Sequence, residues 1–199
     1  MAKIIKFPLP TPEKFGPQRV RKRKEQRVGS TGQLNLFTGG KVVKLNQLTP
    51  FEEALLLDEQ GNKARARIGY LQAIEQEDSV ADAYCNLGII ECTDGAHAKA
   101  IDRFTLCLKA DPRHFEAHYN LANLYAELGN FPLAKAHYEI SIQLEPTFPN
   151  SHFNLGLTLA MNKEFESAVK AIQQFRKLAQ PEDQQLADTL IEKLTSAGG

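Results

Sequence analysis

Apolar residues recur at helical spacing from residue 49 onward, and short polar turns separate the runs. Thr49 and Pro50 are typical of a helix start, because Thr49 can accept from a free backbone N–H and Pro50 suits the first helical position. The spacing predicts helices over 50–60 and 63–77, followed by further helix pairs. Beyond Pro181, an amphipathic helix is indicated by four apolar residues at helical spacing, which are Leu186, Leu190, Ile191 and Leu194.

One sequence pattern repeats at a fixed period through these helices. The triplet Asn-Leu-small occurs at 86–88, 120–122 and 154–156, so the same step separates each copy from the one before. Gly88, in the first helix of its pair, should let the second helix approach near Ala100. The same step links alanines, large apolar residues and helix-ending prolines, namely Ala100, Ala134 and Ala168, then Phe104, Tyr138 and Ile172, then Pro112 and Pro146.

Glycines also mark the turn inside two of the pairs. Gly95 and Gly129 follow the first helix of their repeats, where glycine readily takes the positive φ that often ends a helix. Lys163 stands at the matching place in the last repeat and departs from this preference.

Together these features resemble the tetratricopeptide repeat, or TPR. The resemblance covers about residues 47–181 and is strongest over 81–146. It implies an all-α fold, a right-handed α-solenoid of about four helix-turn-helix repeats. The repeats would span 47–80, which has a degenerate motif, and then 81–114, 115–148 and 149–181, with a capping helix and tail at 182–199.

Residues 1–46 have a different composition. They hold 11 Lys and Arg against 2 acidic residues, a balance of +9, so the rest of this neutral chain carries −9. Residues 1–32 are rich in proline and poor in large apolar side chains, which predicts a flexible basic arm with disorder or transient helix around 18–28. Residues 33–46 alternate apolar and polar positions around a Gly-Gly turn and predict a small β-hairpin or a linker.

By the resemblance, one face of the first helix in each repeat lines a concave groove that binds extended or helical peptides. The predicted groove residues are Asp82, Cys85, Asn86, Ile89, Glu116, Tyr119, Asn120, Asn123, Asn150, Phe153, Asn154 and Leu157. Cys92 and Ala126 lie on the same face, and repeat one would add Glu52, Leu55 and Glu59. Tyr119 and Phe153 are the candidates for apolar anchors, because aromatic side chains dominate interface energetics.

Asn86, Asn120 and Asn154 take the same position in three successive repeats. An asparagine side chain can donate to and accept from one peptide group at once, so the ladder suits an extended ligand. The alternative is that each asparagine is simply tolerated or bonds within its own repeat.

Acidic residues accompany the ladder. Chaperone-binding TPR domains hold a terminal carboxylate with a basic clamp, whereas this chain has Asp82, Glu116, Tyr119 and Asn154 where the clamp would need Lys or Arg. We therefore expect a neutral or basic protein or peptide as partner. A solvated acidic surface with no single partner is the alternative.

The basic run of the arm has three interpretations. In the first, it contacts nucleic-acid phosphates or acts as a localisation signal. In the second, it is a solvated tail, because no aromatic residues interleave with its charges as sequence-specific recognition would require. In the third interpretation the +9 arm folds back onto the −9 body and competes with a ligand. The candidate phosphate-contacting residues are Arg19, Arg21, Lys22, Arg23, Lys24 and Arg27.

No pattern typical of an enzyme or a metal site appears. The five histidines form no ligand-spaced pair, and Cys85 and Cys92, about 10 Å apart along a helix, do not make a zinc site alone. No glycine-rich phosphate loop, nucleophile motif, disulfide framework, signal peptide or membrane span is indicated. We expect a cytoplasmic, non-catalytic adaptor without cofactor or metal. The alternative is a nucleic-acid-associated or regulatory factor whose arm contacts phosphates and whose repeats recruit a protein.

Overall fold

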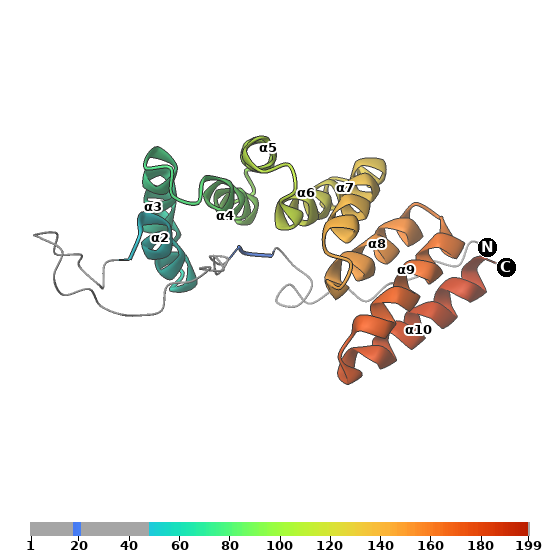
Figure 1. The fold of residues 1–199 in the computed structure, drawn as a ribbon. Coiled ribbons are helices and arrows are strands. Elements are labelled where there is room, and N and C mark those ends of the chain that lie inside the picture. Colours follow the sequence, from blue (N-terminus) through green and yellow to red (C-terminus); the bar gives the residue numbers. More distant parts are fainter. Residues whose placement is uncertain (1–17, 21–47, 199) are drawn as a thin grey trace, which may run out of the picture.

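The computed structural model describes residues 18–20 and 48–198. Over 48–198 it contains nine helices, arranged as successive antiparallel pairs that are followed by a single C-terminal helix (Figure 1). The helices are α2 (Pro50–Glu59), α3 (Lys63–Glu75), α4 (Val80–Thr93), α5 (His97–Ala110), α6 (Phe115–Glu127), α7 (Phe131–Leu144), α8 (Pro149–Met161), α9 (Phe165–Leu178) and α10 (Pro181–Gly198). The predicted all-α solenoid is confirmed. The predicted hairpin at 33–46 lies outside the described residues.

Local sequence explains where the first helix begins. Thr49 Oγ1 accepts from the backbone N–H of Glu52 at 3.3 Å, and the Glu52 carboxylate accepts from the backbone N–H of Thr49 at 2.8 Å. This reciprocal pair is a capping box, and Pro50 takes the first helical position as predicted. The cap fixes the start of α2, which carries one of the side chains of the candidate site.

Glycines allow the two helices of a pair to approach closely. A Cβ added at Gly88 would lie 2.6 Å from the ring of Phe104, and one added at Gly156 would lie 2.5 Å from Ile172. The sequence placed Ala100 opposite Gly88, but the nearest atoms belong to Phe104. A glycine is therefore needed because a large side chain of the second helix fills the space above it.

The turns inside the pairs also follow the prediction. Gly95 and Gly129 have φ of 72° and 74°, and Lys163 takes the same left-handed conformation with φ of 64°. A lysine has a steric penalty there that glycine avoids. The repeat geometry therefore overrides the local preference of residue 163.

The helix α10 covers the end of the solenoid. Its Ala187, Leu190 and Leu194 are buried in the apolar cluster that α8 and α9 form with the third repeat. Leu186 and Ile191 pack against the same cluster and are partly buried. This is the role expected of a capping helix. None of the described helices combines the length and apolarity that crossing a bilayer requires.

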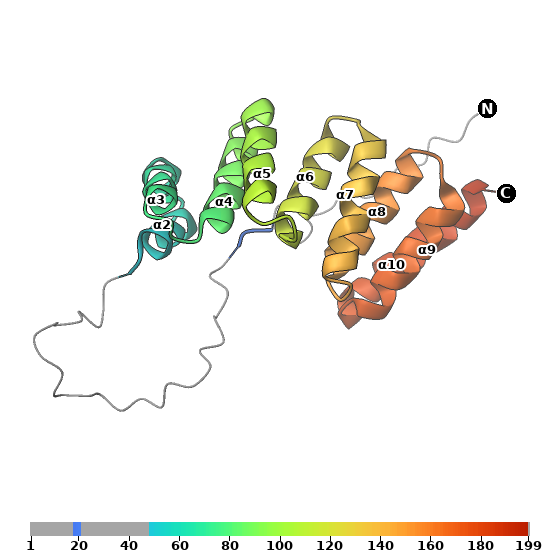
Figure 2. The same cartoon turned by 45° about the horizontal axis from the view of Figure 1, so that its top comes forward.

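Residues 18–20 lie beside α4 and α6, on the side of these helices that faces away from α5 (Figures 1 and 2). These three residues are not in a helix. Their position depends on contacts with repeats that are distant in the sequence. Local composition could not indicate those contacts.

Candidate functional site

Two of the three ladder asparagines hold the backbone of the arm. Asn86 Oδ1 accepts from Val20 N–H at 3.0 Å, and Asn86 Nδ2 donates to the Val20 carbonyl at 3.0 Å. Asn120 does the same for Gln18, with distances of 2.7 and 2.9 Å. Each amide thus satisfies the backbone N–H and C=O groups of one residue of the arm. We call the surface around Asp58, Asn86 and Asn120 the asparagine face.

The spacing of the two contacts defines how a chain lies there. Residues two apart in an extended chain turn their N–H and C=O groups to the same side, about 6.6 Å apart. Gln18 and Val20 are two residues apart, and the amides of Asn120 and Asn86 make the hydrogen bonds to them that a neighbouring strand makes in a β-sheet. The bound segment runs from repeat three towards repeat one, opposite to the order of the repeats.

The side chain of Val20 is buried. It is 1% exposed and belongs to the apolar cluster of repeats two and three, which includes Cys85, Ile89, Leu121 and Leu124. Burying an aliphatic side chain of this size contributes about 1.5–3 kcal/mol. The segment is therefore held by an apolar contact as well as by its backbone.

Arg19 forms an ion pair with a buried carboxylate. Its Nη2 lies 3.0 Å from Oδ1 of Asp58, whose side chain is fully buried. The Tyr70 hydroxyl donates to the other oxygen of Asp58 at 3.3 Å, and Asn86 Nδ2 contacts that hydroxyl at 3.2 Å. Burial raises the pKa of Asp58, while Arg19 and the Tyr70 hydrogen bond act in the opposite direction. One network therefore connects α2, α3, α4 and the arm.

Asp58 was absent from the predicted site, although a signal existed. It stands one repeat period before Cys92, and Cys92 had been placed on the groove face. Because the motif of repeat one is degenerate, the correspondence between Asp58 and Cys92 is not evident from the sequence. The structure adds Asp58 to the site residues because it contacts the bound segment directly.

The third ladder asparagine has different described contacts. Asn154 Nδ2 donates to the Tyr119 hydroxyl at 3.0 Å and to Asn123 Oδ1 at 2.9 Å. Asn123 Oδ1 also accepts from the Tyr138 hydroxyl at 2.6 Å. Asn123 and Asn154 thus belong to one polar network between repeats three and four.

The two predicted anchors are buried rings. Tyr119 packs at a centroid distance of 6.1 Å from Tyr138 and 5.1 Å from Phe148, and Phe153 lies 4.9 Å from Phe175. Both therefore contribute to the core, and their contact with a ligand stays a prediction. Of the remaining predicted groove residues, Ile89 is buried in the cluster that contains Val20, whereas Asn150 and Leu157 are partly buried on α8.

Asp82 and Glu116 meet at His114. His114 Nε2 lies 2.9 Å from Asp82 Oδ1, and Nδ1 accepts from the backbone N–H of Ala117 while lying 3.3 Å from Glu116. Burial acts to lower the pKa of His114, but the hydrogen bond with Asp82 and the nearby Cys107 and Glu116 raise it to about 10. The side chains of Asp82 and Glu116 are only 19% and 11% exposed, so they form no open acidic lining around the ladder.

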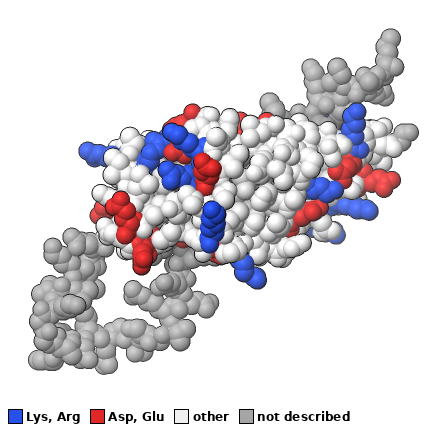
Figure 3. All heavy atoms as spheres, turned by 90° about the horizontal axis from the view of Figure 1, so that it is seen from above, with Lys and Arg blue, Asp and Glu red and all other residues white. Residues whose placement is uncertain are grey.

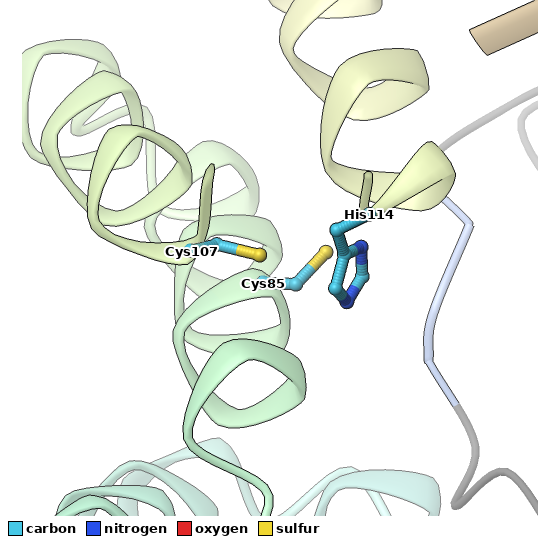
Figure 4. A group of neighbouring side chains, drawn as sticks. All are labelled: Cys85, Cys107 and His114. Atoms are coloured by element: carbon cyan, nitrogen blue, oxygen red, sulfur yellow. The ribbon is translucent and has the colours of Figure 1, made fainter. Parts of the chain in front are cut away.

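Two cysteines and a histidine form a buried group beside the asparagine face. Cys85 of α4, Cys107 of α5 and His114 before α6 place donor atoms within 4.8 Å of one another (Figure 4). The cysteine that lies near Cys85 is Cys107 of the neighbouring helix, a residue that spacing along one helix does not connect to Cys85. Two thiols and an imidazole are donors that Zn²⁺ takes together with a fourth ligand.

The group also has a packing role and a link to the ladder. Burial raises the pKa of Cys85 well above its usual value, whereas a hydrogen bond with Cys85 lowers the pKa of Cys107 to about 7. Asn120 Nδ2 contacts Cys85 Sγ at 3.6 Å. One repeat later the matching residues are Tyr119, Ser141 and Phe148, so these positions belong to the core of the repeat.

Within the described part of the arm, residues 18–20, Arg19 is the one basic residue. Arg19 contacts Asp58, whereas Arg21, Lys22, Arg23, Lys24 and Arg27 lie outside the described residues. On the face of the solenoid seen from above in Figure 3, acidic and basic side chains intermingle around a broad uncharged area. That face therefore presents no field of a single sign.

Two family profiles match the repeats. One profile described as tetratricopeptide repeat matches residues 115–148, and a second with the same description matches 51–114. The chain belongs to the tetratricopeptide repeat family. Its TPR motifs agree with the helix pairs of the structure and with the fixed period of the sequence.

Curated relatives share only part of their length with this TPR chain. The human protein O-mannosyl-transferase TMTC4 is 55% identical over 40 residues, 20% of this chain and 5% of that protein. The tetratricopeptide repeat and J domain-containing co-chaperone DNJ1 of Cryptococcus neoformans is 30% identical over 118 residues, 59% of this chain and 22% of that protein.

Solved TPR structures have the same fold. YrrB, described as a TPR protein with an unusual peptide-binding site, has a TM-score of 0.63 at 20% identity and covers 74% of this chain and 75% of its own. The first TPR of Spaghetti (RPAP3), bound to the HSP90 peptide SRMEEVD, has a TM-score of 0.55 at 21% identity and covers 59% and 91%.

Proposed function

We propose that this protein is a non-catalytic adaptor whose asparagine face binds extended segments of partner proteins. The observation that carries the proposal is the pairing of Asn86 and Asn120 with the backbone of Val20 and Gln18. Four hydrogen bonds to alternate residues form a receptor for a peptide main chain. Such recognition does not need the ligand to belong to this chain.

Peptide-bound relatives support the proposal. The first TPR of Spaghetti was solved with a bound HSP90 peptide, and the TPR2B domain of yeast Sti1 was solved in complex with pHsp70. The present chain offers amides and a buried carboxylate instead of a basic clamp, so a terminal carboxylate is not the expected ligand. The nucleic-acid alternative gains no support from Arg19, whose guanidinium pairs with Asp58.

Selection from a random decapeptide library tests this function. The bait is the full chain with Val20→Asp, since a charge in the apolar cluster should release the chain's own segment. We expect enriched peptides to lose about tenfold or more in affinity when Asn86 and Asn120 are both changed to alanine. The control is Asn162→Ala, which removes an exposed amide from the turn after α8.

The result is interpreted by calorimetry on the enriched peptides, after circular dichroism has shown that the variants keep their helices. Equal affinity for the parent and the double alanine variant would mean that the asparagine face is not the receptor. A loss in the Asn162→Ala control as large as that in the double variant would have the same meaning.

A further inference from the structure

We propose that the asparagine face selects segments with a basic residue followed by a branched aliphatic residue, and that Arg19-Val20 is the chain's own copy of this motif. The proposal rests on the peptide-binding function above and specifies its ligand. Its basis is a pair of side-chain subsites, one at Asp58 and one in the apolar cluster, next to the backbone contacts.

The backbone contacts alone cannot choose a sequence. The amides of Asn86 and Asn120 bind N–H and C=O groups that nearly every residue possesses. They fix the direction of a ligand and the register of its residues. Selectivity must then come from the side chains that this register directs toward the protein.

The first subsite favours a cation. The Asp58 side chain is fully buried and touches Arg19 Nη2 at 3.0 Å and the Tyr70 hydroxyl at 3.3 Å. Lys63 and Glu59 also act on it electrostatically, but the Lys63 amine bonds to the Thr93 hydroxyl. A buried carboxylate without a cationic partner is costly, and an acidic ligand residue would be repelled. An arginine or lysine in the ligand is therefore preferred.

The second subsite favours a compact apolar side chain. Val20 is 1% exposed in a cluster with Cys85, Ile89, Leu121 and Leu124. A polar or charged residue at this position would be desolvated without a partner. A β-branched residue also suits the extended backbone that the two asparagines require. The motif is therefore basic and then aliphatic, in the direction from repeat three to repeat one.

The chain's own segment already occupies both subsites. A tethered segment acts at an effective concentration that reaches the millimolar range for short flexible linkers. A partner must therefore bind more tightly than this internal copy or arrive in a multivalent form. Removal of the copy should expose the same site to any matching segment.

The experiment uses a fluorescein-labelled nonapeptide with the sequence of residues 14–22 as the probe. Fluorescence anisotropy measures its affinity for the full chain and for the full chain with Val20→Asp. We expect the variant to bind the probe about tenfold or more tightly than the unmodified chain, because its internal copy is released. Equal affinity for the two chains would overturn the assignment of Arg19-Val20 as an occupant.

A two-sided substitution tests the cationic subsite. The probe with Arg19→Gln should bind the Val20→Asp chain about tenfold more weakly than the parent probe. When the chain also carries Asp58→Asn, which keeps the shape beside Tyr70, the two probes should differ less than about threefold. A probe with Lys22→Gln removes the same charge outside the motif and is the control. Equal losses for the two probe substitutions, or an unchanged loss in the Asp58→Asn chain, would overturn the subsite.

A third probe tests the apolar subsite and separates this inference from the general function. The probe with Val20→Asp should lose about tenfold or more in affinity for the Val20→Asp chain, and retained affinity would overturn the aliphatic preference. If the parent probe does not bind but library peptides do so through the asparagines, the motif is wrong and the peptide-binding function stands. If neither binds, both are wrong.

Discussion

Shortening the side chain of Val20 should loosen the arm by a predictable amount. Val20→Ala removes two methyl groups from a side chain that is 1% exposed, and leaves the backbone contacts with Asn86 in place. At about 0.8 kcal/mol for each buried carbon, the bound segment loses about 1.6 kcal/mol. Since about 1.4 kcal/mol corresponds to a factor of ten, the released fraction should rise about 14-fold.

Amide hydrogen exchange measured by NMR reports this release. The N–H of Gln18 donates to Asn120 at 2.7 Å, so it exchanges when the segment leaves the face. Its exchange rate should rise about 14-fold in Val20→Ala. In the control Leu133→Ala, which shortens a side chain that is 42% exposed on α7, the rate should not change. A rise of less than about threefold in Val20→Ala would refute the view that the buried valine holds the arm.

Three further predictions concern the repeats. Gly88→Ala should destabilise the protein by about 1–3 kcal/mol in urea unfolding, since its Cβ would lie 2.6 Å from Phe104; a more stable variant would contradict this. Lys163→Gly should raise stability by about 0.5 kcal/mol by relieving φ of 64°, and an unchanged urea midpoint would mean that no strain is present. Burial, and then His118, lower the pKa of His137 to about 4, below its unfolded value of 6.5. The unfolded chain therefore binds a proton at His137 before the folded protein does, so the protein loses stability as the pH falls from 6.5 towards 4. His137→Gln should reduce the loss of stability between pH 7 and pH 4.5 by about 1 kcal/mol, after allowance for partial exposure, and an identical pH profile would contradict it.

The sequence was sufficient for the repeats because their pattern is local and recurs. Gly95 shows this directly, since its place at the end of a helix predicted the positive φ that the structure has. The recurrence on one helix face also singled out Asn86 and Asn120, whose amides contact the backbone of Val20 and Gln18; their binding of a partner stays a prediction.

The remaining parts of the site depend on contacts between distant residues. Asp58 lies in the degenerate first repeat. Its role is evident only from its ion pair with Arg19, a residue of the arm that precedes the repeats. Cys107 and His114 approach Cys85 from two other elements, and no spacing along one helix could indicate that group. Burial of Tyr119 likewise depends on the rings of Tyr138 and Phe148, which lie outside its own helix.

The segment 18–20 touches three repeats at once, through Asp58, Asn86 and Asn120. In a solenoid each repeat otherwise stabilises mainly its immediate neighbours, so unfolding can begin at one end and spread. A chain laid across three repeats is a longitudinal tie, because the loss of the first repeat then also costs contacts made with the third. Occupancy of the asparagine face should therefore make repeats one to three unfold as a single unit, and release should let the first repeat fray by itself.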